Sequence, residues 1–184
     1  MSTPRTVAVL VGSLRQASFT RKIAKAIAEV APAHLTFKFI EIGDLPLYNE
    51  ELEAEVPAAW ARFREEIHAA DAFLFATPEY NRSVPAALKN AIDVGSRPYG
   101  HSGWTGKPAA VVSTSMGPLS GFGANHHLRQ SLVFLNMPVL QQPEAYLGLT
   151  GTYFDDNGQL VKEGTREFLT TFANAFSDWI EKVA

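Results

Sequence analysis

The chain contains no cysteine. Disulfide bonds, zinc–thiolate sites, thiol nucleophiles and cysteine-bound iron–sulfur clusters are therefore excluded. The chain also has no hydrophobic run long enough to span a bilayer. The apolar run near the N-terminus, Thr6–Val11, ends at Gly12 and is too short for the core of a secretion signal. We therefore expect a cytoplasmic protein without membrane insertion.

Neither sign of charge dominates the chain. Lys and Arg together number 16, Asp and Glu together number 19, and the net charge is −3. This balance gives no general attraction to nucleic acids or anionic membranes, so neither is expected as a partner. Two nucleotide-binding signatures are also missing. No G-x-G-x-x-G follows the first apolar run, and Gly106-Lys107 lacks the leading glycine and the final Ser or Thr of a P-loop.

Hydrophobic residues make up 46% of the 184 residues, which suits one folded domain spanning residues 1–184. Short apolar runs alternate with segments of helical periodicity, a pattern typical of parallel β-α-β units. We predict an α/β three-layer sandwich around a five-stranded, doubly wound parallel sheet, whose ligands bind beyond the carboxyl ends of the strands. The predicted strands are Thr6–Val11, Leu35–Ile42, Ala72–Thr77, Ala109–Ser113 and Pro138–Leu140, and the predicted helices are Phe19–Ala31, Ala58–Ala70, Pro85–Val94, Gly123–Asn136 and Glu163–Val183.

The loop between the first strand and the first helix carries three hydroxyl side chains and one arginine: Ser13, Ser18, Thr20 and Arg15. A helix N-terminus offers unpaired N–H groups and partial positive charge, and both favour an anion. Hydroxyl groups and a guanidinium would complete a phosphate site. The simpler alternative is that Ser18 only caps the helix and Arg15 only faces water.

Two further loops follow the third and fourth predicted strands. Pro78 and Pro85 bracket the first of them and stiffen its backbone, so that it can hold a flat polar ring edge-on. The alternative is an ordinary turn whose charged residues face water. The second loop, residues 113–123, contains three glycines that permit close backbone approach to a ligand, and its successive N–H groups can stabilise negative charge. Its alternative is a flexible surface loop.

Several segments together resemble the NAD(P)H-dependent FMN reductase family, and within it the quinone and chromate reductase branch. These segments are GSLRQASFTRKIA, LPLYNEE, PEYNRSVPAALKNAIDVGSRP, GKPAAVVSTSMG and HLRQSLVFLNMPV. The resemblance extends from Thr6 to the last helix, and the block that begins at Pro78 is its most specific part. It implies a flavodoxin-like fold with strand order 2-1-3-4-5. It also implies FMN as the cofactor and NADPH or NADH as the electron donor.

The same resemblance implies roles for individual residues. The FMN phosphate would bind to Ser13, Arg15, Ser18, Phe19 and Thr20. The edge of the flavin ring would meet Pro78, Glu79, Tyr80 and Asn81, mainly through backbone groups, and its pyrimidine end would lie beside Ser115, Met116 and Gly117. Tyr48 and Asn49 match the family pattern without an assigned role. No side chain is expected as a catalytic group, because the flavin carries the chemistry.

The implied reaction passes two electrons from a nicotinamide through the flavin to a small acceptor such as a quinone, an azo or nitro compound, or chromate. A flavodoxin-type electron carrier and a flavin-binding sensor are the alternatives, because fold alone does not decide between them. No metal site is expected, since His126 and His127 are adjacent and would point about 100° apart on a helix. A homodimer or homotetramer is expected from the several apolar sides of the predicted helix Gly123–Asn136 and from the resemblance.

Overall fold

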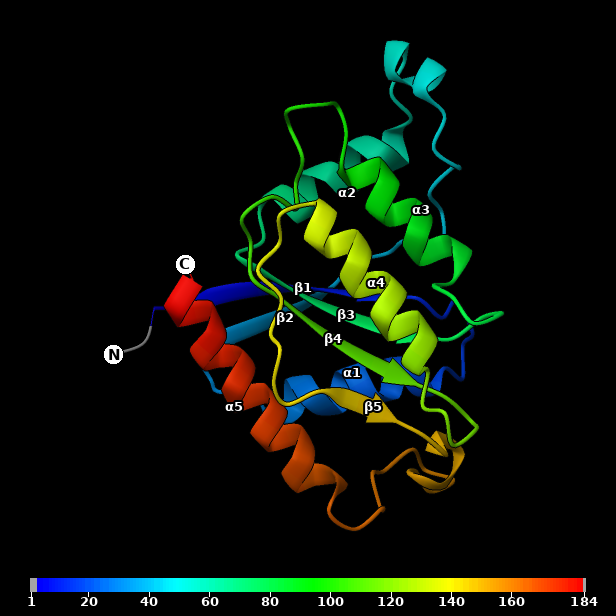
Figure 1. Cartoon of the computed structure of the whole chain (residues 1–184), viewed down its shortest axis with the longest axis vertical. Coiled ribbons are helices and arrows are strands. Elements are labelled where there is room, and N and C mark those ends of the chain that lie inside the picture. The colour runs from blue at the N-terminus through cyan, green and yellow to red at the C-terminus, as the bar shows by residue number, and fades with distance from the viewer. Residues whose placement is uncertain (1–2, 184) are drawn as a thin grey trace.

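The computed structural model describes residues 3–183, and it contains a five-stranded parallel sheet. The strand order is β2-β1-β3-β4-β5, as predicted, and the fold is flavodoxin-like (Figure 1). All four neighbouring pairs are parallel, so every carboxyl end lies at the same edge of the sheet. The strands are β1 (Arg5–Val11), β2 (Leu35–Phe39), β3 (Ala72–Pro78), β4 (Ala109–Thr114) and β5 (Ala145–Leu147).

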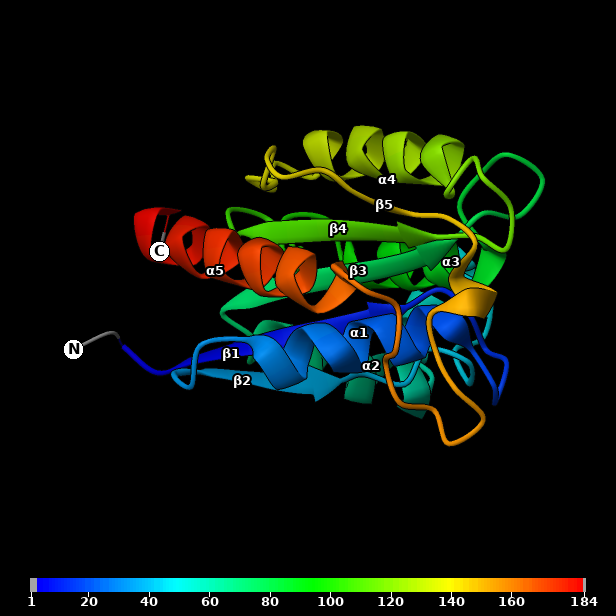
Figure 2. The same cartoon turned by 90° about the horizontal axis from the view of Figure 1, so that it is seen from below.

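Helices cover both faces of this sheet. Figure 2 shows α1 and α5 in front of the strands and α2 and α3 behind them, and α4 packs on the same face as α2 and α3. The α-helices are α1 (Phe19–Val30), α2 (Ala58–His68), α3 (Ala86–Gly95), α4 (Phe122–Phe134) and α5 (Thr165–Val183), and two short 3₁₀ helices are η1 (Glu50–Ala54) and η2 (Thr150–Thr152). Within residues 3–183 no helix is both long and apolar enough to cross a membrane.

The two faces of the sheet build two hydrophobic cores. Successive side chains of a strand point to opposite faces, so Val7 and Val9 of β1 pack against α1 and α5, whereas Ala8 and Leu10 pack toward α2 and α3. All of these side chains are buried. This burial on both faces explains why the central strands are continuous apolar runs rather than alternating ones.

The prediction of the fifth strand was wrong. Residues 138–140 form only a single bridge, between Val139 and Ala109, and the fifth strand is Ala145–Leu147. Pro138 has no N–H to donate, and its carbonyl and the N–H of Leu140 both bond to Ala109 at the beginning of β4. β5 instead pairs with the carboxyl half of β4, from Val112 to Thr114, and so it ends beside the loops that follow β3 and β4.

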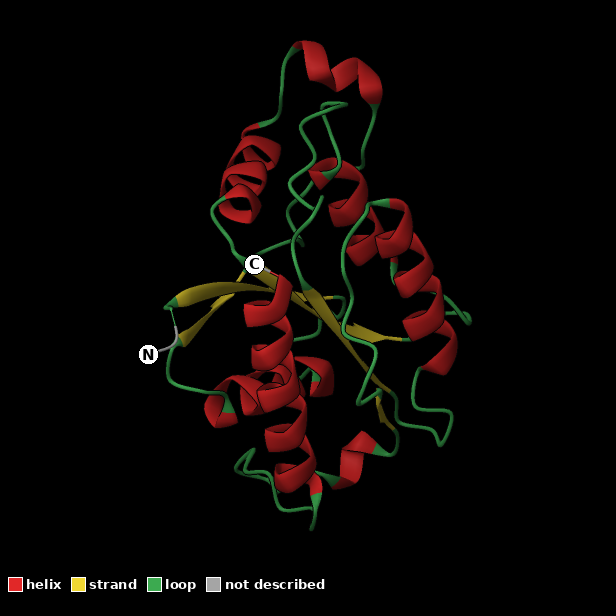
Figure 3. Ribbon diagram, turned by 60° about the vertical axis from the view of Figure 1, so that its left-hand side comes forward, coloured by secondary structure: helices red, strands yellow, loops and turns green. Residues whose placement is uncertain are grey.

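The second strand ends earlier than predicted, at Phe39 instead of Ile42. The N–H of Ile40 still bonds to Val9, but the Glu41 carboxylate then accepts the N–H groups of Ile42 and Gly43 and turns the chain away from the sheet. Beyond this turn the chain rises to η1, which stands away from the sheet at the top of Figure 3.

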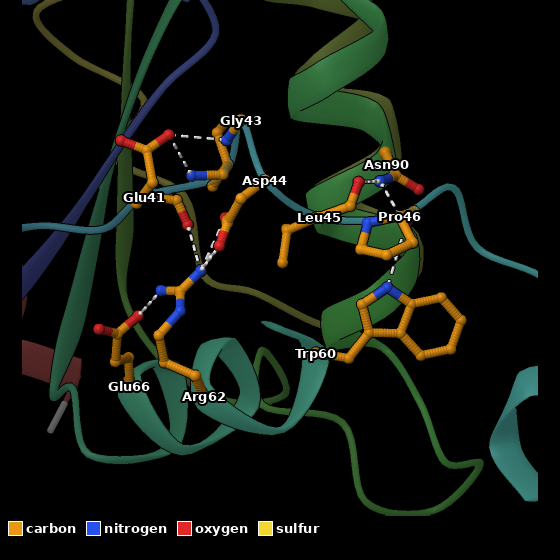
Figure 4. A network of polar contacts seen from close by, with 10 residues as sticks. Glu41, Gly43, Asp44, Leu45, Pro46, Trp60, Arg62, Glu66 and Asn90 are labelled. Atoms are coloured by element: carbon orange, nitrogen blue, oxygen red, sulfur yellow. Dashed lines mark hydrogen bonds and ion pairs between the residues drawn. The ribbon is translucent and has the colours of Figure 1, made fainter. Parts of the chain in front are cut away.

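Polar contacts fasten the segment after β2 to two helices (Figure 4). Arg62 of α2 donates to the Glu41 carbonyl and pairs with two carboxylates, those of Asp44 and Glu66. Asn90 of α3 donates to the carbonyls of Leu45 and Pro46. The segment between β2 and η1 is therefore held by side chains of α2 and α3 and does not depend on a ligand for its contacts.

Tyr48 belongs to this structural network. Its N–H donates to Asn90 Oδ1 over 2.8 Å, and its ring stacks on Trp60 with the ring centroids 5.3 Å apart. Asn49 caps η1 through the N–H of Glu51. These contacts give both Tyr48 and Asn49 a structural role.

Candidate functional site

A cavity of about 290 Å³ opens at the carboxyl ends of the central strands. The loops after β1, β3 and β4 supply most of its lining, and these loops lie beside the strand arrowheads in Figure 1. Small-molecule sites measure about 300–1,000 Å³, so the volume of this cavity is close to the lower limit of that range. It is lined by Ser13, Arg15, Ser18, Phe19, Thr20, Pro78, Glu79, Tyr80, Thr114, Ser115, Met116 and Thr150.

The beginning of α1 forms one end of the cavity. Ser18 caps the helix by accepting the N–H of Arg21 over 3.1 Å, as the simpler alternative predicts for this residue. The capping bond satisfies only one of the early N–H groups, and a helix leaves its first four without intrahelical acceptors. Ser13 is buried and lines the cavity, and its hydroxyl bonds to no other group in residues 3–183. This end therefore offers unused hydrogen-bond donors together with the positive end of a helix dipole.

Arg15 and Thr20 complete this end of the cavity. Arg15 is exposed and forms no ion pair with a residue in the described range 3–183, so its charge is free for an anion. Thr20 is buried, and its hydroxyl lies 2.6 Å from the hydroxyl of Thr114 at the end of β4. That bond joins α1 directly to the carboxyl end of β4, which fixes the beginning of the helix against the strand ends.

The loop after β3 forms a second wall. Pro78 is the last residue of β3, and the chain then makes a tight turn in which Tyr80 and Ser83 exchange two backbone hydrogen bonds. Glu79 and Tyr80 line the cavity, but Asn81, at the tip of the turn, does not. The Glu79 carboxylate faces α4 and Arg82, where both of its oxygens have partners.

The loop after β4 forms the third wall, and residues after β5 hold it in place. The N–H of Ser115 donates to Leu147, while the Ser115 carbonyl accepts both the N–H and the hydroxyl of Thr150. The N–H of Gly117 donates to the Ser115 hydroxyl over 2.9 Å. The N–H groups of Ser115 and Gly117 are therefore already bonded, whereas the N–H of Met116 has no acceptor within residues 3–183.

The structure brings ten of the twelve predicted site residues to this one cavity. The two that do not line it are Asn81 and Gly117. The sequence reasoning missed Thr114 and Thr150. Thr114 is the last residue of β4, directly before the loop that was singled out. Thr150 follows β5 within a short Gly- and Thr-rich stretch, and a fifth strand predicted at Pro138–Leu140 does not point to this stretch.

The lining offers little acid–base chemistry of its own. Its titratable side chains are Arg15, Glu79 and Tyr80, and both carboxylate oxygens of Glu79 already accept hydrogen bonds. No histidine lies in the lining to activate a hydroxyl group. Within the described part of the chain, no three His, Asp or Glu side chains are arranged to hold a metal ion. The cavity therefore suits binding and orientation of a group that carries its own reactivity.

A tyrosine with a displaced pKa lies elsewhere, on β5. Burial raises the pKa of Tyr146 to about 12, with a further contribution from its hydrogen bond to Glu144. The Tyr146 hydroxyl also lies 2.9 Å from Nε2 of His126 on α4. None of these three side chains lines the cavity, so this cluster is part of the contact between α4 and β5.

Comparisons of the sequence with a family model and with curated proteins point to the same family. The model of a family described as NADPH-dependent FMN reductase matches residues 5–151. A quinone reductase of Pseudomonas putida is 61% identical over 182 residues, which cover 98% of this chain and 97% of the relative. A 2-hydroxy-1,4-benzoquinone reductase of a Burkholderia species is 42% identical over 174 residues, 95% of each chain.

A solved structure is also closely similar. The flavoenzyme FerB of Paracoccus denitrificans, described as an NAD(P)H:(acceptor) oxidoreductase, superposes with a TM-score of 0.91. It is 43% identical to this chain, and the match covers 97% of this chain and 98% of FerB. Fold, length and sequence therefore agree along almost the whole chain.

Proposed function

Because this chain belongs to the NADPH-dependent FMN reductase family, we propose that it is a quinone reductase that transfers two electrons from NADPH or NADH through FMN. The observation that carries this proposal is the cavity bounded by the loops after β1, β3 and β4 in a chain 61% identical to a quinone reductase over 98% of its length. A flavin supplies the chemistry when bound, namely the uptake of a hydride and its transfer to an acceptor.

The residues at the beginning of α1 fit the phosphate of FMN. Unpaired N–H groups, the positive end of the helix dipole and the free Ser13 hydroxyl all favour an anion. Arg15 adds a positive charge that no acidic side chain in the range 3–183 neutralises. Helix capping involves only Ser18 and leaves the other polar groups of this loop unused, so we favour anion binding over the alternative that the loop only caps the helix.

The other two walls fit a flat ring system. Tyr80 and Met116 line the cavity and are nevertheless 47% and 61% exposed, respectively. Leu119 and Leu149 are also exposed in the neighbouring segments. Such exposed apolar side chains around an opening mark a surface that binds a ligand. The flat, largely apolar ring of a quinone buries this surface better than a small hydrated oxyanion does, which favours quinones as acceptors.

The chain's own groups have three tasks in this proposal. The N-terminus of α1 and Arg15 bind the phosphate. The stiff segment from Pro78 to Tyr80 orients the ring. The N–H of Met116 would donate a hydrogen bond to the pyrimidine end of the ring and would stabilise negative charge there, in the manner of an oxyanion hole. Azo compounds, nitro compounds and chromate stay predictions, because none of the three relatives above is named for them.

An anaerobic titration tests this function. Protein reconstituted with FMN is mixed with NADPH or NADH, and the visible absorbance of the flavin is followed before and after addition of benzoquinone. We expect rapid bleaching by the nicotinamide and recovery of the absorbance on addition of the quinone. A protein that binds FMN but is not bleached by either nicotinamide would be an electron carrier or a sensor, and the proposal would be wrong.

We also propose that the protein is a homodimer or homotetramer. Val133 and Phe134 at the end of α4 expose 71% and 87% of their surface, and Phe134 borders a groove between α3 and α4. A second copy of the same face would remove these apolar side chains from water. Sedimentation equilibrium at micromolar concentration should give a dimer or a larger even-numbered assembly, and Phe134→Glu should shift it toward monomer. A wild-type protein that sediments only as a monomer would refute this assembly.

A further inference from the structure

Glu79 has an unusual position for an acidic residue at a proposed phosphate-bearing cofactor. Its side chain is only 11% exposed, and it lines the cavity. One oxygen pairs with the Arg82 guanidinium over 2.9 Å, and the other accepts the N–H of Ala124 over 3.1 Å. Each oxygen of the carboxylate is therefore already engaged by a group of this chain. Its contacts point to a role in holding its neighbours.

The first of these neighbours is the N-terminus of α4. The N-cap residue of this helix is Gly121, at φ +71°, and it has no side chain to accept an N–H group. Glu79 supplies the missing acceptor from the loop after β3, 45 residues earlier in the chain. A Cβ at Gly123 would lie 2.9 Å from a Glu79 oxygen and 3.0 Å from the Arg82 carbonyl. The helix and the loop therefore approach each other closely around this carboxylate.

The second neighbour is the tight turn Tyr80–Ser83, called here the 80–83 turn. Its two central residues, Asn81 and Arg82, have φ values of +49° and +65°, and the end residues exchange both backbone hydrogen bonds. This is the geometry of a two-residue type I′ turn, for which Asn-Gly is the preferred pair. Asparagine accepts the left-handed region well, whereas arginine is strained there and glycine is not.

The strained residue is the one that pairs with Glu79. An ion pair between two exposed side chains contributes little, but here the carboxylate is nearly buried and needs a cation, while Arg82 is 71% exposed. The pair therefore holds Arg82 in a conformation that its backbone disfavours. The Ser83 hydroxyl adds a second link between the turn and α4, because it lies 3.1 Å from Nδ1 of His127.

We propose that Glu79 is a positioning residue that locks the 80–83 turn against α4 and so fixes the ring-binding edge of the cavity. Tyr80 lines that edge, and the N–H of Asn81 has no acceptor within residues 3–183, so it is available to a ligand atom. The inference rests on the proposed FMN-dependent function. It adds that Glu79 acts on the cofactor through the backbone of the turn and through no direct contact of its carboxylate.

The test compares two variants of Arg82, which is exposed and can be replaced without disturbing the core. Arg82→Ala and Arg82→Gly both remove the ion pair, but only alanine keeps the strain of the positive φ. The dissociation constant of FMN is measured by quenching of its fluorescence, together with the visible spectrum of the bound flavin. We expect Arg82→Gly to bind FMN at least about threefold more tightly than Arg82→Ala, because glycine keeps the turn formed unaided.

Glu79 is then tested by rescue. Glu79→Ala should weaken FMN binding about tenfold, as expected for one charge-assisted contact, and should shift the spectrum of bound FMN. Adding Arg82→Gly to Glu79→Ala should recover at least about threefold of that loss. Glu66→Ala is the matched control, since Glu66 is also paired with an arginine but lies on α2 away from the cavity. This control should bind FMN as the wild type does.

Three results would overturn the inference. They are wild-type FMN affinity in Glu79→Ala, equal affinities of Arg82→Gly and Arg82→Ala, and a Glu79→Ala loss that Arg82→Gly does not relieve. If Glu79→Ala fails to fold, Glu79→Gln replaces it, because its amide oxygen can still accept the Ala124 N–H while the charge on Arg82 goes unpaired. Failure of the wild-type protein to bind FMN is a separate result, and it would remove the proposed function itself.

Discussion

Replacement of Arg15 by alanine separates cofactor binding from fold stability. Arg15 is exposed, lines the cavity and has no ion-pair partner within residues 3–183. Its loss should therefore change the free energy of unfolding by no more than about 0.5 kcal/mol, as for other surface positions without special contacts. A hydrogen bond from a charged group to a phosphate contributes about 1.5–3 kcal/mol. Arg15→Ala should accordingly raise the dissociation constant of FMN about 10- to 150-fold.

A matched control uses the neighbouring arginine of α1. Arg21 carries the same charge, but its guanidinium lies over the ring of Phe39, 6.0 Å from the centroid, and it does not line the cavity. Arg21→Ala keeps the backbone N–H that Ser18 accepts. FMN binding is measured by fluorescence quenching and unfolding by urea. The reasoning would be refuted if Arg15→Ala bound FMN as the wild type does, or if both variants lost affinity equally, since the effect would then be one of overall charge.

Three further changes test other parts of the structure. Gly148→Ala places a Cβ 3.0 Å from the Gly117 carbonyl, so it should lower the free energy of unfolding in urea by about 1–3 kcal/mol and weaken FMN binding. A variant with wild-type stability and wild-type FMN affinity would contradict this close packing. Asn90→Ala removes three hydrogen bonds to the segment after β2 and should lower the free energy of unfolding by about 2 kcal/mol. If urea unfolding shows a decrease of less than about 0.5 kcal/mol, other contacts hold the segment. The native protein keeps the Tyr146 proton up to a pKa of about 12, whereas the unfolded chain releases it near 10. The free energy of unfolding should therefore decrease as the pH rises between these two values, and this decrease should be smaller in Tyr146→Phe. If the variant shows the same decrease as the wild type, Tyr146 is not the group responsible.

The sheet and three loops of the site could be predicted because their signals are local. The central strands are buried on both faces, so β1, β3 and β4 appear as continuous apolar runs in the sequence. The strand order came from the family resemblance, and the structure confirms it. In a parallel sheet the ends of these strands must lie together, which is why ten of the predicted residues meet at one cavity.

The errors concern features that only tertiary contacts determine. β5 is three residues long, too short to show a periodic pattern, and its true position brings Thr150 to Ser115 through two hydrogen bonds. Gly117 is the one local exception, because its N–H is bonded to the Ser115 hydroxyl two residues earlier, and a glycine-rich composition does not reveal that bond. The contact between Glu79 and Ala124 spans 45 residues, so no local pattern could have indicated it.

The most direct test of the proposed FMN site is the structure of crystals of the protein grown with excess FMN. It should show the phosphate at the N-terminus of α1 beside Ser13 and Arg15, and the flavin ring between the segment from Pro78 to Tyr80 and the loop at Met116. Electron density for FMN at any other place, or none at these strand ends, would contradict the claim that one cavity formed by three loops binds the cofactor.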